Sequence, residues 1–134
     1  MIRLMYCSQA KTDFTKYTLE EILLTSRKNN ALQNITGVLV HGGGMFMQVL
    51  EGPEARVLRT YVKILDDARH SDSRIIHITP IKDRLFTNWT MGVVEADPLT
   101  FDEVAKLRAH RSESVEPDVF VNLMHKFNGM LIKA

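Results

Sequence analysis

Apolar residues alternate with other residues along several short segments of the chain and recur at helical spacing along two longer ones. Period-2 alternation and short runs of β-branched residues are typical of strands, and they predict strands at 2–7, 36–41, 45–51, 75–81 and 88–95. Apolar residues three and four positions apart predict a helix over about 19–30 and a second from Pro53 to about 67–70. The predicted order is therefore βαββαββ.

Local signals mark several boundaries of these elements. Thr18 and Glu21 fit a capping box, which predicts that the first helix starts just after Thr18. Glycines 42–44 predict a hairpin turn, because glycine adopts positive φ freely; a phosphate loop would end in Lys-Ser/Thr and precede a helix. Pro53 suits the first turn of a helix, whereas Pro80 predicts that the fourth strand lies at an edge or a bulge.

This order of elements predicts an α+β, ferredoxin-like sandwich, an antiparallel-rich five-stranded sheet with two helices on one face. The other face would present a second apolar set, Met5, Cys7, Val38, Val40, Met47 and Val49. Such a face is too apolar to remain in water, and an apolar helical stripe within 117–133 is predicted to cover it, alone or with a second subunit. We expect a core at 1–96 and a C-terminal helical extension at 97–134.

Composition and charge narrow the classes of function. A chain of 134 residues with 45% hydrophobic residues can fold as one domain without disulfides or metal. A formal charge of +1 provides no long-range field that would attract nucleic acid or an anionic membrane. Cys7 is the only cysteine, and the sequence shows neither a signal peptide nor an apolar run near 20 residues, so we expect a cytoplasmic protein.

Residue types that carry hydrolytic or metal chemistry are present but poorly spaced. The five histidines never fall at metal-ligand spacing with one another or with cysteine, and no Ser-His-Asp order can be read. Asp66 and Asp67 are adjacent on a predicted helix and cannot face each other. We therefore expect no metal site and no enzyme activity.

Gln48 is an amide at a position where a buried strand would usually carry a hydrophobic residue. Alternation places it on the same strand face as Phe46 and Leu50, where an unsatisfied amide costs a few kcal/mol. Tyr6 shares a face with Ile2 in the first strand, so the phenol and the amide are predicted to meet. Two interpretations remain open: the two side chains satisfy each other in a small core, or they hold a polar ligand between them.

Further amide and aromatic residues join this pair. Asn29 and Asn30 end the first helix, where asparagine is also a common cap, and Trp89 and Met91 in the fifth strand would individually be core residues. Together they supply donors, acceptors and a redox-capable aromatic around a flat slot between the two helices. A flat heteroaromatic ring with carbonyl and imide edges would fit this slot.

Six segments resemble, in order and at family spacing, a BLUF domain, the family of blue-light sensors that use FAD. They are YCS at 6–8, SRKNN at 26–30, ITGVL at 35–39, FMQVLEG at 46–52, DDARH at 66–70 and RLFTNWTMG at 84–92. The resemblance spans about residues 1 to 96. The sequence departs from the family at Asn34, where glycine is common, and at His41, where tyrosine is common.

The resemblance implies a role for each matching residue. Tyr6 and Gln48 would be the photochemical pair, with Tyr6 the light-driven electron and proton donor and Gln48 the bridge to the flavin. The implied cofactor contacts are Tyr6, Asn29, Asn30, Gln48, Lys63, Asp67, Arg69 and His70. Trp89 and Met91 match the residues that transmit the signal. FAD is the implied cofactor, with FMN or riboflavin as substitutes.

The implied mechanism rewires hydrogen bonds without a covalent adduct. Light drives an electron and a proton from Tyr6, and Gln48 rotates or tautomerises so that it donates to a flavin carbonyl. We expect output through a partner protein or a change of homo-oligomer, and not through an attached enzyme. Light is expected to alter the docking of residues 117–133. The alternative is a ferredoxin-like small-molecule binding module or enzyme without photochemistry.

Overall fold

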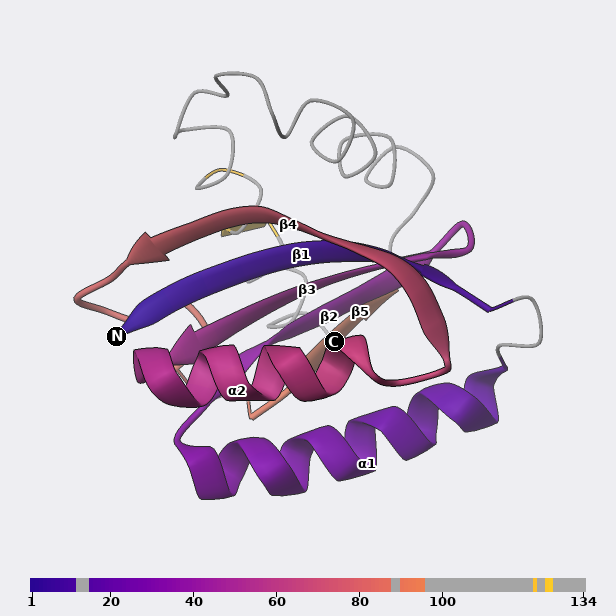
Figure 1. Cartoon of the computed structure of the whole chain (residues 1–134), viewed down its shortest axis with the longest axis horizontal. Coiled ribbons are helices and arrows are strands. Elements are labelled where there is room, and N and C mark those ends of the chain that lie inside the picture. Colours follow the sequence, from indigo (N-terminus) through magenta and orange to yellow (C-terminus); the bar gives the residue numbers. More distant parts are fainter. Residues whose placement is uncertain (12–14, 88–89, 96–121, 123–124, 127–134) are drawn as a thin grey trace.

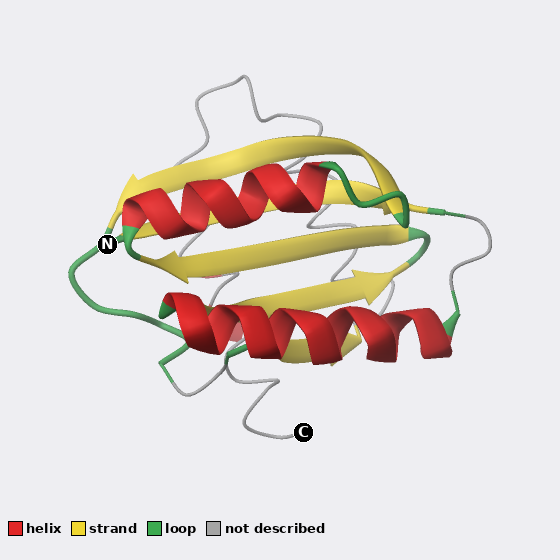
Figure 2. Ribbon diagram, turned by 60° about the horizontal axis from the view of Figure 1, so that its bottom comes forward, coloured by secondary structure: helices red, strands yellow, loops and turns green. Residues whose placement is uncertain are grey.

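The protein is a sheet covered on one face by two helices (Figures 1 and 2). The computed structural model describes residues 1–11, 15–87, 90–95, 122 and 125–126. In chain order the elements are β1 (Ile2–Ala10), α1 (Lys16–Gln33), β2 (Thr36–Gly42), β3 (Met45–Gly52), α2 (Glu54–Leu65), β4 (His70–Pro80) and β5 (Gly92–Glu95). The predicted order βαββαββ and the ferredoxin-like sandwich are confirmed.

The five strands lie side by side in the order β4-β1-β3-β2-β5. Each neighbouring pair is antiparallel except β2 and β5, which are parallel. The prediction that Pro80 lies near an edge or a bulge is confirmed, because β4 has β1 as its only neighbour among the described strands and ends at Pro80. β3 is therefore the central strand of the sheet, and β1 and β2 lie on either side of it.

Alternation along the central strands separates two buried layers. The face toward the helices contributes Ile2, Leu4, Tyr6, Leu39, Phe46 and Leu50 to a core that includes Leu19 and Leu23 of α1 and Val57 and Tyr61 of α2. On the opposite face, the six residues predicted from the sequence are fully buried. The stretch 117–133 and the extension 97–134 lie outside the residues that can be described, apart from residues 122 and 125–126, so their roles stay predictions.

Several predicted helix boundaries were wrong. The N-cap of α1 is Thr15, whose side chain accepts a hydrogen bond from the backbone N–H of Thr18 at 3.3 Å. Thr18 thus lies inside the first turn and is not the cap, because another threonine three residues earlier provides the same oxygen. The C-terminus of α1 is Gln33, so Asn29 and Asn30 lie inside its last turns and do not end the helix as predicted. The C-terminus of α2 is Leu65, earlier than the predicted 67–70.

Two strand boundaries also differ from those predicted. β4 begins at His70, five residues before the isoleucine run that indicated it, because its first half is polar and pairs with the long β1. β5 begins only at Gly92, so Met91 precedes this strand and does not belong to it. Asn88 and Trp89 are outside the described residues.

Backbone conformation explains two sequence features. Gly43 and Gly44 adopt φ of 55° and 76° in the β2–β3 turn, as the hairpin prediction requires. Asn34 ends α1 in the left-handed conformation with φ 57°, which glycine also adopts freely, so this departure from the family keeps the local backbone. At Gly37, an added Cβ would lie 1.9 Å from the Val49 carbonyl oxygen, so only glycine lets β2 approach β3 here.

Candidate functional site

A cavity of about 370 Å³ lies between the two helices and the sheet. All eight residues predicted as cofactor contacts line it: Tyr6, Asn29, Asn30, Gln48, Lys63, Asp67, Arg69 and His70. Its size is that of a small-molecule pocket. The structure thus brings together residues that span more than sixty positions of the sequence, while their contact with a cofactor remains a prediction.

Tyr6 and Gln48 form the floor of this cavity. They are directly opposite in the β1–β3 register, and the Tyr6 hydroxyl donates a hydrogen bond to Gln48 Oε1. Both side chains are buried. Gln48 Nε2 donates to the Met91 sulfur at 3.4 Å, and a thioether is a weak acceptor. The amide therefore has a firm bond at its oxygen and a weak one at its nitrogen.

Burial determines the protonation state of Tyr6. Desolvation, reinforced by the neighbouring Tyr61, Asp67 and Cys7, raises the pKa of the Tyr6 phenol well above its ordinary value near 10. The Tyr61 ring lies 5.0 Å away between centroids and excludes water from this side. Tyr6 consequently keeps its proton across the physiological range and can act as the donor in its bond to Gln48.

His70 joins the end of α2 to β1 beside this pair. Its Nε2 lies 2.6 Å from the Ile64 carbonyl oxygen and its Nδ1 lies 2.8 Å from Ser8 Oγ. A carbonyl only accepts, so Nε2 carries the proton, and in the neutral ring Nδ1 accepts from the Ser8 hydroxyl. The ring is thereby fixed 6.4 Å, between centroids, from the Tyr6 ring.

The last turns of α1 hold the residues that precede β5. Asn30, only 2% exposed, donates from Nδ2 to the Thr90 carbonyl at 2.7 Å, and Arg27 Nε donates to the Met91 carbonyl at 3.1 Å. Among the described residues, no side-chain or backbone donor reaches Asn30 Oδ1. A buried acceptor on the wall of a cavity is a site where a ligand donor would be favoured.

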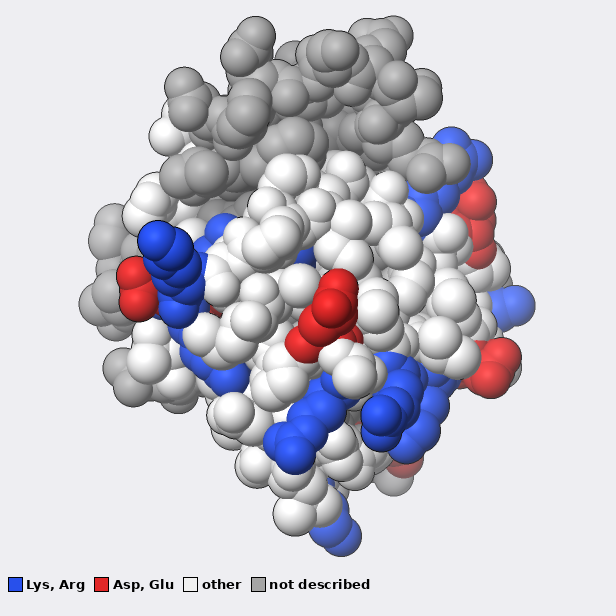
Figure 3. Space-filling model, turned by 60° about the vertical axis from the view of Figure 1, so that its left-hand side comes forward, with Lys and Arg blue, Asp and Glu red and all other residues white. Residues whose placement is uncertain are grey.

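Positive side chains gather on the α2 wall of the cavity. Arg56, Arg59 and Lys63 recur at helical spacing and line it together with Arg69, and Asp67 is the single carboxylate in the lining. Hydrogen bonds from Arg69 lower the pKa of the Asp67 carboxyl. Figure 3 shows a group of Lys and Arg side chains in the lower part of the molecule, where Figure 1 places the helices. The mouth of the cavity therefore favours an anionic group.

Four residues of this region were not predicted from the sequence. Arg27 acts through its guanidinium, and Thr90 acts through its backbone carbonyl. Every residue type has that carbonyl, so it leaves no signal in the sequence. Arg56 and Arg59 could have been found from their spacing with Lys63 on α2. Of the two predicted signalling residues, Met91 contacts Gln48, whereas Trp89 lies outside the described residues.

The described residues contain neither a cluster of metal ligands nor a membrane-spanning helix. No group of three or more histidine, cysteine, aspartate or glutamate side chains there could hold a metal ion. No helix in the same ranges has the length and apolar content needed to cross a bilayer.

The amino-acid sequence is similar to a known family and to proteins of known activity. The sequence model of the BLUF family, sensors of blue-light using FAD, matches residues 1–92. The beta subunit of photoactivated adenylate cyclase from Euglena gracilis is 39% identical over 89 residues, which are 66% of this chain and 10% of that protein. The alpha subunit from the same organism is 37% identical over 64% of this chain and 8% of that protein. The chain thus spans about a tenth of the length of these curated relatives.

Solved structures with the same fold include small proteins of similar length. The photo-activated state of BlsA has a TM-score of 0.79 at 26% identity, covering 98% of this chain and 94% of that chain. The dark-state structure of BlrB, a BLUF protein, also scores 0.79 at 26% identity, covering 96% of this chain and 95% of that chain. A bacterial light-regulated adenylyl cyclase scores 0.70 at 31% identity, with 40% of that chain covered.

Proposed function

Because the chain belongs to the BLUF family and is a flavin-binding blue-light photoreceptor domain, we propose that its signal begins at the Tyr6–Gln48 hydrogen bond. The observation that carries this proposal is the position of this bond on the floor of a ligand-sized cavity. The matched segment is a sensor, and the cyclase activity in the names of the relatives belongs to proteins of which this segment is a small part.

The polar groups of the cavity complement the edge of a flavin ring. That edge carries carbonyl acceptors and one imide N–H donor. The Asn30 oxygen would accept from the imide, and a Gln48 N–H would donate to a carbonyl, where its present contact with the Met91 sulfur offers little competition. Asn29, Asp67, Arg69 and His70 would complete the surroundings of the ring and its ribityl chain.

When bound, the flavin supplies absorption of blue light and, in its excited state, an oxidant strong enough to accept an electron from a phenol. Tyr6 is the phenol in the cavity floor that also holds a proton directed at Gln48. Loss of that proton and electron removes the donor that fixes the Gln48 carbonyl. Gln48 can then exchange its two ends, because an amide offers a donor at one corner and an acceptor at the other.

We further propose that FAD is the preferred flavin. The cations of α2 and Arg69 would lie along the part of the ligand that projects from the ring, where FAD carries a diphosphate and riboflavin carries no charge. Charge-assisted bonds from arginine to phosphate oxygens are stronger than neutral ones. FMN, with one phosphate, would bind with intermediate affinity.

We propose that output passes to a partner protein or to a second copy of the chain. Large apolar side chains exposed on the outer side of α2 and on β4 support this, namely Leu58, Val62, Leu65, Ile75 and Ile78. Light-scattering mass measurements on the purified protein in darkness and under blue light test the oligomer arm. A mass that is the same in both states would leave the partner protein as the route of output.

The photochemical proposal is tested by absorption spectroscopy of the flavin-loaded protein before and after blue light. We expect a reversible red shift of the flavin band that is absent in Gln48→Leu, which keeps the bulk and removes both polar ends. Gln9→Leu, on an exposed position of β1, is the matched control and should keep the shift. A colourless protein that takes up no flavin, or a full shift in Gln48→Leu, would contradict the proposal.

A further inference from the structure

A buried ion pair lies on the reverse side of the strand pair that carries Tyr6 and Gln48. In the antiparallel β1–β3 register, Tyr6 pairs with Gln48. Arg3, three positions earlier on β1, pairs with Glu51, three positions later on β3. An odd offset places the second pair on the opposite face of the sheet. Arg3 Nε and Nη2 donate to Glu51 Oε2 at 2.9 and 2.8 Å, and the Glu51 side chain is fully buried. The same ladder thus has a photochemical pair on one face and a charged pair on the other.

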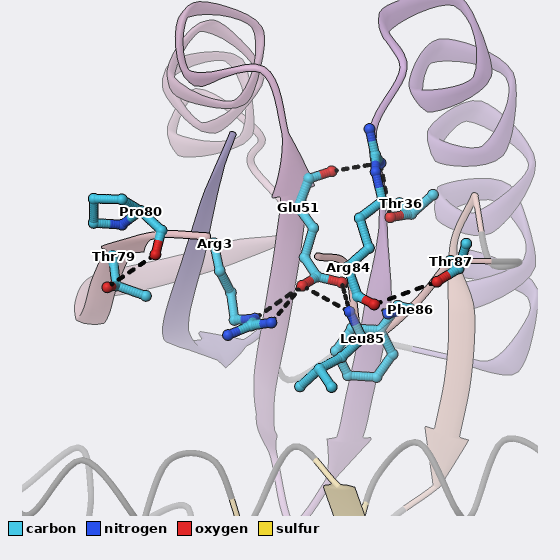
Figure 4. A network of polar contacts seen from close by, with 9 residues as sticks. All are labelled: Arg3, Thr36, Glu51, Thr79, Pro80, Arg84, Leu85, Phe86 and Thr87. Carbon is cyan, nitrogen blue, oxygen red and sulfur yellow. Dashed lines mark hydrogen bonds and ion pairs between the residues drawn. The ribbon is translucent and has the colours of Figure 1, made fainter. Parts of the chain in front are cut away.

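The Glu51 carboxylate also holds the loop that follows β4. It accepts hydrogen bonds from the backbone N–H of Leu85, at 3.0 and 3.1 Å, and of Phe86, at 2.8 Å. Figure 4 shows both amides directed at the carboxylate, with Arg3 on its other side. Phe86 is fully buried and lies outside the strands, so its N–H has no ladder partner. Glu51 supplies the acceptor that a neighbouring strand would otherwise provide.

Arg84 fastens the start of the same loop. Its Nη1 donates to Thr36 Oγ1 at 2.9 Å and to the Glu51 carbonyl at 3.1 Å, and its Nη2 donates to the Asn34 carbonyl at 2.7 Å. These contacts join the loop to the end of α1, the start of β2 and the end of β3, and Figure 4 shows those to Thr36 and Glu51. Among the described residues, Glu51 is the side chain that bonds to both Arg3 and the loop amides.

The loop leads directly to Met91. Four residues separate Phe86 from Met91 in the sequence, so a short length of chain joins the two positions. Met91 itself lies on the helix side of the sheet, where its sulfur accepts from Gln48 and its carbonyl accepts from Arg27. Phe86 is thus held by Glu51, and Met91 is held by Gln48 and Arg27 of the cavity region.

We propose that Glu51 is a positioning residue for the photochemical network, setting from the reverse face of the sheet how Met91 meets the Gln48 amide. This inference rests on the role proposed above for Gln48. The carboxylate acts through the Leu85 and Phe86 amides and touches neither the phenol nor the flavin. Its consequence is that the lifetime of the light-induced state depends on an acceptor outside the flavin cavity.

Stability alone is a weak reason for this arrangement. Burying two charges costs several kcal/mol per ion, and replacing a buried pair with apolar residues of similar size is often neutral or stabilising. The two loop amides are different, because no apolar substitute can accept their hydrogen bonds. The acceptor, and not the charge, is therefore the part of Glu51 that positions the loop.

Two matched double variants separate acceptor from charge. Arg3→Met with Glu51→Gln removes both charges and keeps an oxygen for the loop amides, whereas Arg3→Met with Glu51→Leu removes the oxygen as well. We expect the first to recover in darkness at a rate within about threefold of the unmodified protein. The second should keep its flavin but recover at least about tenfold faster or slower, which corresponds to about 1.4 kcal/mol in barrier height.

A third double variant provides the same test if leucine at position 51 prevents folding. Arg3→Met with Glu51→Asn retains an amide but withdraws it by one methylene, so it should resemble the leucine variant in recovery rate. In a Met91→Leu background the difference between the glutamine and asparagine variants should disappear, because the loop then has no sulfur to position. A purely structural role would leave that difference intact.

The outcomes separate this inference from the proposed function. If the unmodified protein shows no red shift, the photochemical proposal fails and the comparison is not reached. If it shows a normal shift and the glutamine, asparagine and leucine variants all recover at one rate, Glu51 does not position the network and the inference is overturned.

Discussion

At the scale of single residues, the site depends on an imbalance between the two ends of Gln48. Its oxygen accepts from a phenol that burial keeps protonated, and its nitrogen meets a thioether, a far weaker acceptor. An amide held equally at both ends would resist exchange. Here the stronger bond is the one that depends on the Tyr6 proton, so loss of that proton releases the residue.

The protonation of Tyr6 predicts an alkaline effect on stability. Burial raises its pKa above the ordinary value near 10, so above that pH the unfolded chain releases a proton that the folded chain keeps. The free energy of unfolding is unaffected by this group below pH 10 and falls as the pH rises further, by about 1.4 kcal/mol per pH unit.

Tyr6→Phe removes this contribution. We expect denaturant titrations of the flavin-loaded proteins to show that the free energy of unfolding falls less steeply above pH 10 in the variant. The difference in slope should be about 1.4 kcal/mol per pH unit, the value for one proton. The same variant should lose the normal photocycle, because it has no phenolic proton to give. Equal slopes in the two proteins would show that Tyr6 ionises as easily in the fold as in the unfolded chain.

At the scale of elements, α2 presents three different faces to its surroundings. Val57 and Tyr61 enter the core, Leu58 and Val62 face solvent, and the basic residues from Arg56 to Lys63 line the cavity. The apolar spacing in the sequence predicted one stripe that included all four of these apolar residues, and it did not distinguish the two that are buried from the two that are exposed. It did not predict the cationic face, because charged residues on a helix are usually only a solvated surface.

The cationic face predicts a selection among flavins. In Arg56→Gln with Arg59→Gln, we expect the affinity for FAD and FMN to fall by about fivefold to tenfold, since an exposed charge pair contributes about 0.2–1 kcal/mol. Riboflavin, which has no phosphate, should bind as before. Fluorescence titration of the flavin-free protein with each ligand measures this.

The matched control is Lys28→Gln, an exposed position of α1 outside the cavity lining. It should leave all three affinities unchanged, and added salt should weaken FAD binding less in the double arginine variant than in the control. An equal loss for riboflavin and FAD would mean that the arginines act on the ring or on folding and not on phosphate.

Strands and their faces were predictable from alternation, as Tyr6 opposite Gln48 shows. Boundaries were less so: a second threonine displaced the predicted cap of α1, and polar residues concealed the first half of β4. The eight predicted cavity residues come together because they lie on elements whose packing followed from the pattern. Contacts of the loop before β5 had no such pattern, since they use backbone groups and a fully buried glutamate.

At the scale of the whole molecule, the cavity lies between the helices and the sheet, because residues of α1, α2 and the strands line it. A ligand there completes the core between them, and it binds the folded chain alone. Flavin should therefore stabilise the fold by mass action, by about 2.7 kcal/mol at a free concentration one hundred times its dissociation constant.

Thermal unfolding at several flavin concentrations measures this linkage. We expect the midpoint to rise with the logarithm of free FAD and to be lowest after the flavin has been stripped. Gln9→Leu should follow the same line as the unmodified protein. A midpoint that does not move with FAD would place the flavin outside the cooperative core.

β5 has a consequence for how a change at Met91 spreads. It contains four residues, pairs with β2 alone among the described strands, and does so in parallel, a slightly weaker pairing per residue. Its detachment would leave the antiparallel ladders of the other four strands intact, so its opening free energy is expected to be the lowest in the sheet. Met91 adjoins the start of this strand, and a bias of about 1.4 kcal/mol there would change the ratio of attached to detached β5 tenfold. A change at Met91 would therefore act on an occupancy, the fraction of molecules in which β5 is paired with β2, without requiring the other four strands to separate.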